Sequence, residues 1–216
     1  MENSQRCFDL LQAGDENGIR GLLDADSSLS DARDAGGVSL LMQALYRGRR
    51  NLAEAIAAKK SDLDVFEVAS LGRVDRLRAV AGDRVAVASF SKDGFTALHF
   101  ACYFGQAEAA RILLEAGAKA DAVAQNPMQV MPLHSAASAK NLEAARLLIE
   151  HGAPVNARQQ GGWTAIHAAA QNGDWAMVKL LLKHGANARA ANDQGQTPAA
   201  AARDKGHAGI AELLEK

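Results

Sequence analysis

The chain has 216 residues, of which 48% are hydrophobic and 5% aromatic, with 24 basic against 25 acidic side chains. This composition excludes a disordered chain, and the near-zero net charge removes any general attraction to nucleic acid or membranes. The two cysteines, Cys7 and Cys102, are too few for a disulfide scaffold. No apolar run reaches the roughly 18 residues of a membrane span, and residues 1–14 lack the apolar stretch of a secretory signal. We therefore expect a cytoplasmic protein.

The first third of the chain carries a faint rhythm of paired helices. A glycine is expected between the two helices of each pair, at Gly14, Gly48 and Gly72, with steps of 34 and 24 residues. Segments 8–34, 37–64 and 65–90 are therefore predicted as three degenerate repeats. The short second step predicts that the turn before residue 65 is cut away, so that its helix begins directly.

Charge is distributed unevenly over this first third. Residues 1–34 carry 3 basic and 8 acidic side chains, whereas residues 47–92 carry 10 basic and 6 acidic ones. Blocks of mixed sign usually form solvated surface. The alternative is that segment 47–92 binds an anionic ligand or nucleic acid, beginning with its most basic part at Arg47, Arg49, Arg50, Lys59 and Lys60.

The rest of the chain, residues 93–216, repeats two blocks. The first block reads GFTALHFA at 94–101, QVMPLHSA at 129–136, GWTAIHAA at 162–169 and GQTPAAAA at 195–202. The second block reads ARILLEAGA at 110–118, ARLLIEHGA at 145–153 and VKLLLKHGA at 178–186. The sixth position of this block, at His99, His134, His167 and Ala200, recurs after 35, 33 and 33 residues. Such a period indicates stacked supersecondary units.

Each unit can be interpreted physically as two short helices. Thr and Pro at the start of the first block suit a helix N-cap and first turn, and the glycine near the end of the second block suits a left-handed helix end. Small alanines allow neighbouring helices to approach closely. Cys102 falls on the first helix beside these small residues, where we expect a buried and unreactive thiol.

This pattern resembles the ankyrin repeat, with its Gly-x-Thr-Pro-Leu-His opening and Leu-Leu-x-x-Gly-Ala close. The resemblance implies an all-α solenoid of stacked helix–turn–helix units with short β-turn fingers, about seven repeats including degenerate caps. It implies a single array over residues 1–216, with degenerate repeats in 1–92 and four well-matched repeats, the C-terminal cap among them, in 93–216.

The resemblance also implies a non-catalytic module that binds a partner protein through its concave face. No nucleophile elbow, phosphate loop, dinucleotide fingerprint or paired-cysteine motif is present, so no catalytic residue, cofactor or metal is predicted. His99, His134 and His167 should lie about 10 Å apart in successive repeats, too far to share one zinc ion. We expect a protein partner, no membrane or nucleic acid, and a monomer, with the oligomeric state left open.

Partner-binding residues are expected at the turn tips and just before the glycine between paired helices, where packing leaves residue type free. These positions are Tyr46, Arg47, Lys92, Asp93, Phe95, Tyr103, Phe104, Met128, Val130, Gln160, Trp163, Gln171 and Asn172. Five of the ten aromatic residues fall among them, and aromatic side chains are favoured interface anchors. The alternative is that some of them pack against a neighbouring turn.

Two further positions carry open predictions. Trp175 takes the place of Ala107 and Leu142 in the other repeats and is predicted to be core. The segment 124–131 is two residues longer than its counterparts and contains Met128. It is interpreted either as a specificity-determining projection or as a tolerated loop insertion.

Overall fold

The computed structural model describes residues 2–216, which form α-helices, two short 3₁₀ helices, turns and one isolated antiparallel bridge between Arg33 and Ser39. The α-helices are α1 (Glu2–Ala13), α2 (Glu16–Ala25), α3 (Leu40–Tyr46), α4 (Arg50–Ala57), α5 (Val65–Leu71), α6 (Val74–Val80), α7 (Arg84–Ala88), α8 (Ala97–Tyr103), α9 (Ala107–Glu115), α10 (Pro132–Ser138), α11 (Leu142–Glu150), α12 (Ala165–Gln171), α13 (Trp175–Lys183), α14 (Pro198–Asp204) and α15 (Ala208–Glu215). The predicted all-α class is confirmed. α1 begins at Glu2, earlier than the expected first repeat at residue 8.

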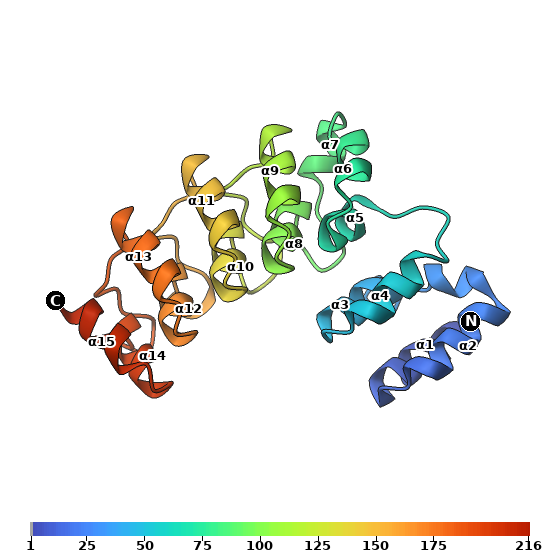
Figure 1. Cartoon of the computed structure of the whole chain (residues 1–216), viewed down its shortest axis with the longest axis horizontal. Helices are drawn as coiled ribbons and strands as arrows, with labels where there is room; N and C mark the ends of the chain where they lie inside the picture. Colours follow the sequence, from blue (N-terminus) through green and yellow to red (C-terminus); the bar gives the residue numbers. More distant parts are fainter. Residues whose placement is uncertain (1) are drawn as a thin grey trace.

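The helices pack as consecutive pairs in two layers. An inner layer runs through α3, α5, α8, α10, α12 and α14, and each of these contacts the next one along the chain. The outer layer contains α2 and α4, which pack together, and α6, α9, α11 and α13, which pack in turn. Figure 1 shows that the stack from α5 to α15 curves, with the inner helices on the concave side. The solenoid is confirmed, whereas the number of seven repeats stays a prediction.

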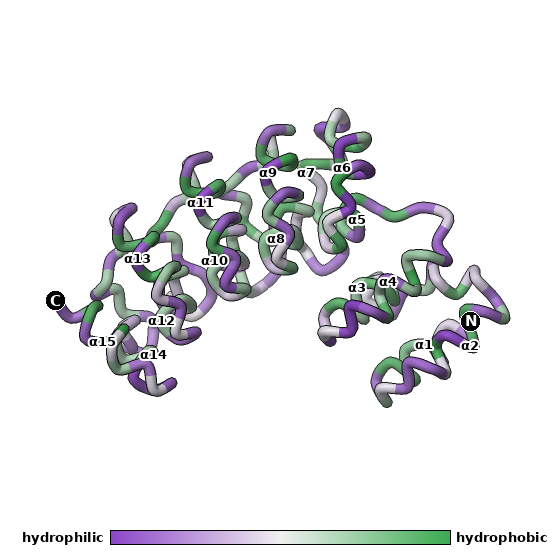
Figure 2. Tube along the Cα trace, in the orientation of Figure 1, coloured by the Kyte–Doolittle hydropathy of each residue, from purple (hydrophilic) through white to green (hydrophobic). Residues whose placement is uncertain are grey.

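The apolar stripes of the two layers face each other and make the core. Figure 2 shows hydrophobic and hydrophilic residues interspersed along the helices. Leu98 and Leu113, from an inner and an outer helix of one pair, are both fully buried, and so is Cys102. Burial raises the pKa of the Cys102 thiol, which confirms the prediction of a buried cysteine.

Helix starts follow the expected residue types. Thr96 and Thr197 are N-caps whose hydroxyl oxygens accept hydrogen bonds from the backbone amides of His99 and Ala200. Asp64 caps α5 in the same way, so the helix begins without a preceding turn. Gly117 closes α9 in the left-handed conformation, with φ +93°.

Projecting turns join the helix pairs, and each is closed by a backbone hydrogen bond. We call these turns fingers; they span residues 34–38, 91–95, 124–130, 159–163 and 192–196. The last four form a ladder, in which the amides of Gln125, Gln160 and Asp193 donate to carbonyls of the preceding finger at 2.8, 2.9 and 2.9 Å. No finger precedes α5, as the 24-residue step predicts.

Gly94 allows this ladder to form, and its substitution tests it. Gly94 has φ +84°, and a Cβ there would lie 2.6 Å from the carbonyl oxygen of Gln125. Gly195 has φ +77° and no atom within 4 Å of an added Cβ. In both Ala variants the free energy of unfolding should fall by about 1–2 kcal/mol, because a Cβ strains the left-handed backbone conformation. Gly94→Ala should lose more, because the neighbouring backbone must move. Urea unfolding measures both, and equal losses would contradict this role.

Trp175 corrects the sequence prediction, because its side chain is 46% exposed and does not lie in the core. It begins α13 on the outer side of the array. There its ring lies against Gly209 of α15, where an added Cβ would approach it to 3.0 Å, and Lys179 lies 5.8 Å from the ring centroid. Ala107 and Leu142 fit the equivalent place half-buried, but an indole is too large for it and spreads over the surface.

Candidate functional site

A cavity of about 480 Å³ opens on the inner side of the array, over α3, α8 and α10. We call it the groove; it is lined by Tyr46, Asp93, Phe95, His99, Phe100, Tyr103, Met128, Val130, Ser135, Ser138 and Gln159. Three lining residues, Tyr46, Tyr103 and Met128, are 37, 50 and 46% exposed. They are half of the six large hydrophobic side chains that the described residues leave exposed.

Aromatic rings make one wall of the groove. The Phe100 ring lies 6.4 Å from that of Tyr46, 5.7 Å from that of Phe95 and 6.4 Å from that of Phe104, and Tyr103 packs edge-on against Phe104 at 5.2 Å. Tyr46 comes from α3, whereas the others lie on α8, in the finger before it or, for Phe104, directly after its last residue. The wall is therefore assembled from two helix pairs that are not consecutive in the chain.

A hydrogen bond fixes Tyr46 at the end of this wall. Its hydroxyl donates to the carboxylate of Asp93, which also accepts a hydrogen bond from the Ser91 hydroxyl at 2.5 Å. Burial and the neighbouring carboxylate raise the pKa of Tyr46 well above its ordinary value. The hydroxyl therefore stays protonated and remains a donor at physiological pH.

The floor of the groove carries no formal charge. The inner helices α8, α10 and α12 contain no Asp, Glu, Lys or Arg, and Asp93 is the one charged residue that lines the cavity within residues 2–216. Lys92 lies at the rim against Gly37, and Arg47 donates to the carbonyl of Gln43 at 3.1 Å. The groove thus presents aromatic and aliphatic surface with a few hydroxyl and amide groups.

Not every predicted partner-binding residue lines the groove. Six of them do: Tyr46, Asp93, Phe95, Tyr103, Met128 and Val130. The remaining seven lie outside its lining: Arg47, Lys92, Phe104, Gln160, Trp163, Gln171 and Asn172.

Several of these outlying residues hold the array together. The Asn172 amide donates to the carbonyls of Ala137 and Ser138 at 3.2 and 3.1 Å, so it ties α12 to α10. The Trp163 ring packs on His167 of its own repeat, with centroids 5.3 Å apart. Asn172 and Trp163 therefore pack within the array, which is the alternative given for the predicted partner-binding residues, and do not form a free surface.

The lining also contains five residues that the predicted set lacks: His99, Phe100, Ser135, Ser138 and Gln159. Phe100 had a detectable signal, because it stands where the following repeats have Ser135 and Ala168. A phenyl ring in a slot for small side chains must protrude or displace its neighbours. Ser135 and Gln159 carry no such signal, since both types are common on helices and turns.

The three regularly spaced histidines connect their inner helices to the segment before the next helix pair, in the finger or just before it. Their Nε2 atoms lie 2.9, 3.0 and 3.1 Å from the carbonyl oxygens of Val130, Ala157 and Gln196, for His99, His134 and His167 respectively. Burial lowers the pKa of all three, to about 4 for His99.

Carboxylates accompany the cations of segment 47–92. Two of these ion pairs reach back to the acidic first segment, where Arg49 meets Glu16 at 3.2 Å and Lys59 meets Asp24 at 2.9 Å. Others lie within the segment or reach forward: Arg50–Glu54, Arg73–Glu54, Arg76–Asp62 and Arg78–Glu108. The opposite charge blocks of the sequence therefore neutralise each other locally.

Comparisons with known proteins identify the repeat. A family model described as ankyrin repeats (3 copies) matches residues 67–159 and 133–216, and no curated protein matches the chain. The match begins within α5 and runs to the last residue, so it includes the helices that form most of the groove. Among the described residues, no helix is both long and apolar enough to cross a bilayer.

Proposed function

The chain belongs to the ankyrin-repeat family, whose members are generally protein–protein interaction modules and typically non-catalytic, and from this premise we propose that the groove binds a segment of a partner protein. The observation that carries the proposal is the convergence of Tyr46, Tyr103 and Met128, all more than a third exposed, on one cavity. Large apolar side chains gathered in a concave site are favoured anchors for a partner.

The chemistry of the groove favours an uncharged binding segment. A charge buried against α8 and α10 would lose its hydration, which costs several kcal/mol by general estimates. Asp93, the one charged residue of the lining, already accepts hydrogen bonds from the Tyr46 and Ser91 hydroxyls. A bulky apolar side chain of the partner would enter between Tyr103 and Met128. Backbone or amide groups beside it would meet Ser138 and Gln159, which line the same cavity.

The alternative, an anionic ligand or nucleic acid on segment 47–92, has less support. A polyanion would have to displace the carboxylates already paired with Arg49, Lys59, Arg73 and Arg76. Exposed pairs of this kind are weak individually, but their carboxylates lie beside these cations and would repel such a ligand.

Replacing Tyr103 and Met128 by Ala tests the groove. The immobilised chain captures its partner from a native lysate, mass spectrometry identifies it, and calorimetry then measures its affinity for each variant. The double variant should bind at least about tenfold more weakly, because two anchors are truncated. Binding should change little between about 50 and 300 mM salt, since no charge pairs form in the groove.

Trp175→Ala is the matched control, because Trp175 is as exposed as Met128, at 46%, but lies on the outer side of the array. It should keep the affinity of the unaltered chain. The proposal fails if Trp175→Ala weakens binding and the groove variant does not.

A further inference from the structure

Two separate apolar clusters make up the core of the array. The larger one contains buried residues between Val68 and Leu214, and the smaller one contains buried residues between Cys7 and Ile56 together with Leu71 and Phe100. Half-buried Leu63 and Phe66 contact both. The boundary therefore lies at α5, where the shortened repeat begins.

The connections that join neighbouring repeats elsewhere are absent at this boundary. The ladder of finger backbones runs from Gly94 toward the C-terminus, and among the described residues no backbone hydrogen bond joins the 34–38 finger to the 91–95 finger. The histidine that reaches the next finger in later repeats is replaced by Met42 in α3 and Glu67 in α5. Glu67 instead accepts a hydrogen bond from Ser39 of the preceding repeat, at 2.6 Å.

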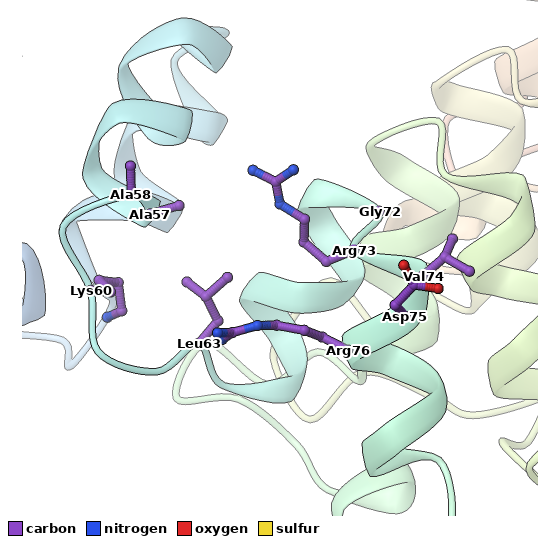
Figure 3. A pocket seen from close by; sticks show the side chains of 9 residues that line it. All are labelled: Ala57, Ala58, Lys60, Leu63, Gly72, Arg73, Val74, Asp75 and Arg76. Carbon is purple, nitrogen blue, oxygen red and sulfur yellow. The ribbon is translucent and has the colours of Figure 1, made fainter.

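A cavity of about 500 Å³ lies between the outer helices α4 and α6 at the same boundary. Figure 3 shows Ala57 and Ala58 on one side and Arg73, Val74 and Arg76 on the other, with Leu63 and Lys60 on the connecting loop below. The outer layer is therefore hollowed here, and side chains reach across the hollow in the Arg73–Glu54 ion pair and in the hydrogen bond from Arg50 to the Leu71 carbonyl at 3.0 Å. In Figure 1 the helices α1–α4 are offset from the curved stack that starts at α5.

A buried ionic cluster closes the boundary from within. Lys60, with a side chain only 4% exposed, lies 3.3 Å from Glu67 and 2.9 Å from Asp31, and Glu67 is fully buried. Lys60 belongs to the loop 58–64 between α4 and α5, and Glu67 belongs to α5. Ser39 lies between the 34–38 finger and α3. These three residues, which we call the clamp, tie both sides of the boundary together through charge and hydrogen bonds.

We propose that the chain consists of two bodies, residues 2–57 and 65–216, joined by a hinge in residues 58–64, and that the clamp of Ser39, Lys60 and Glu67 holds the hinge closed. Closure places Tyr46 of the first body against Asp93 and Phe100 of the second body. The groove is therefore complete only in the closed form. This last step rests on the function proposed for the groove, whereas the hinge itself does not.

Electron spin resonance distances between paired labels test the hinge in the chain without any partner. One pair, Asn17→Cys with Lys119→Cys, spans the boundary; the control pair, Lys119→Cys with Lys183→Cys, lies within the second body. All three positions are exposed, and the native Cys7 and Cys102 are buried, so labelling is selective. Glu67→Gln should broaden the spanning distance distribution at least about twofold and leave the control pair unchanged.

Ser39→Ala is the second variant, which removes the hydrogen bond to Glu67 and also the N-cap hydrogen bond from the Met42 amide. It is decisive if Glu67→Gln broadens both distance distributions. It too should broaden the spanning pair alone. A spanning distribution that stays as narrow as the control in both variants would overturn the hinge. Because no partner is present in this experiment, that outcome does not contradict the groove proposal. Conversely, failure of the groove to capture a partner does not contradict the hinge.

Discussion

Lys60→Met is expected to lower the free energy of unfolding by about 3–5 kcal/mol, the usual effect of removing one partner from a buried ion pair. The Lys60 side chain is 4% exposed and pairs with the fully buried Glu67. Without the ammonium group, Glu67 keeps only its hydrogen bonds from the Ser39 hydroxyl and the Asp64 amide. Its desolvated carboxylate must then remain charged without a cation or take up a proton. Urea unfolding followed by circular dichroism measures the loss.

The neighbouring lysine supplies the control. Lys59 is 42% exposed and pairs with Asp24, which is 71% exposed, so Lys59→Met should change stability by less than about 1 kcal/mol. Adding Glu67→Gln to Lys60→Met should recover part of the loss, because the unpaired charge disappears. Equal effects of the two lysine variants would show that the buried cluster contributes nothing special to stability.

Acidification from about pH 7 to about pH 5 should destabilise the array through its buried histidines. The folded pKa of His99 is about 4 against an ordinary 6.5, so the unfolded chain takes up the proton first. The contribution of neutral His99 to the stability is therefore present in full above pH 6.5, and it is lost as the pH falls toward 4. His99 alone should contribute a loss of about 2 kcal/mol by pH 5. His134 and His167 have lowered pKa values and act in the same direction.

Glu67 opposes this trend, because burial raises its pKa and the folded chain therefore holds that proton more tightly. Unfolding curves at several pH values separate the contributions. His99→Gln lowers stability at every pH but should flatten the pH dependence, whereas the exposed His184→Gln serves as the control. If His99→Gln leaves the loss between pH 7 and 5 unchanged, His99 is not the residue responsible.

The regular part of the fold could be predicted from the sequence because each repeat carries the same pattern of apolar, capping and glycine residues. Thr96 and Thr197 cap helices, and Gly117 and Gly185 end them, for reasons that depend only on neighbours along the chain. Even the missing finger before α5 could be predicted from a glycine step. These features are local, and local rules suffice for them.

The candidate site was predicted less completely because its residues meet across the chain. The free positions included Tyr46, Tyr103 and Met128, which line the groove, but nothing local distinguishes them from Asn172, whose amide joins two inner helices. Trp175 was wrongly placed in the core because an equivalent position does not imply enough room for an indole. The clamp was missed because Glu67 occupies a histidine slot and pairs with a lysine that belongs to a loop.

Methyl spectra of the chain labelled at methionine and spectra of its tryptophan indole N–H groups, recorded as the captured partner is added, test the central claim most directly. Met128 lines the groove and Met177 is fully buried in α13. We expect a large shift of the Met128 methyl signal and no shift of the Met177 methyl signal or the Trp175 indole signal. A partner that moves the Trp175 indole and leaves Met128 untouched would contradict it.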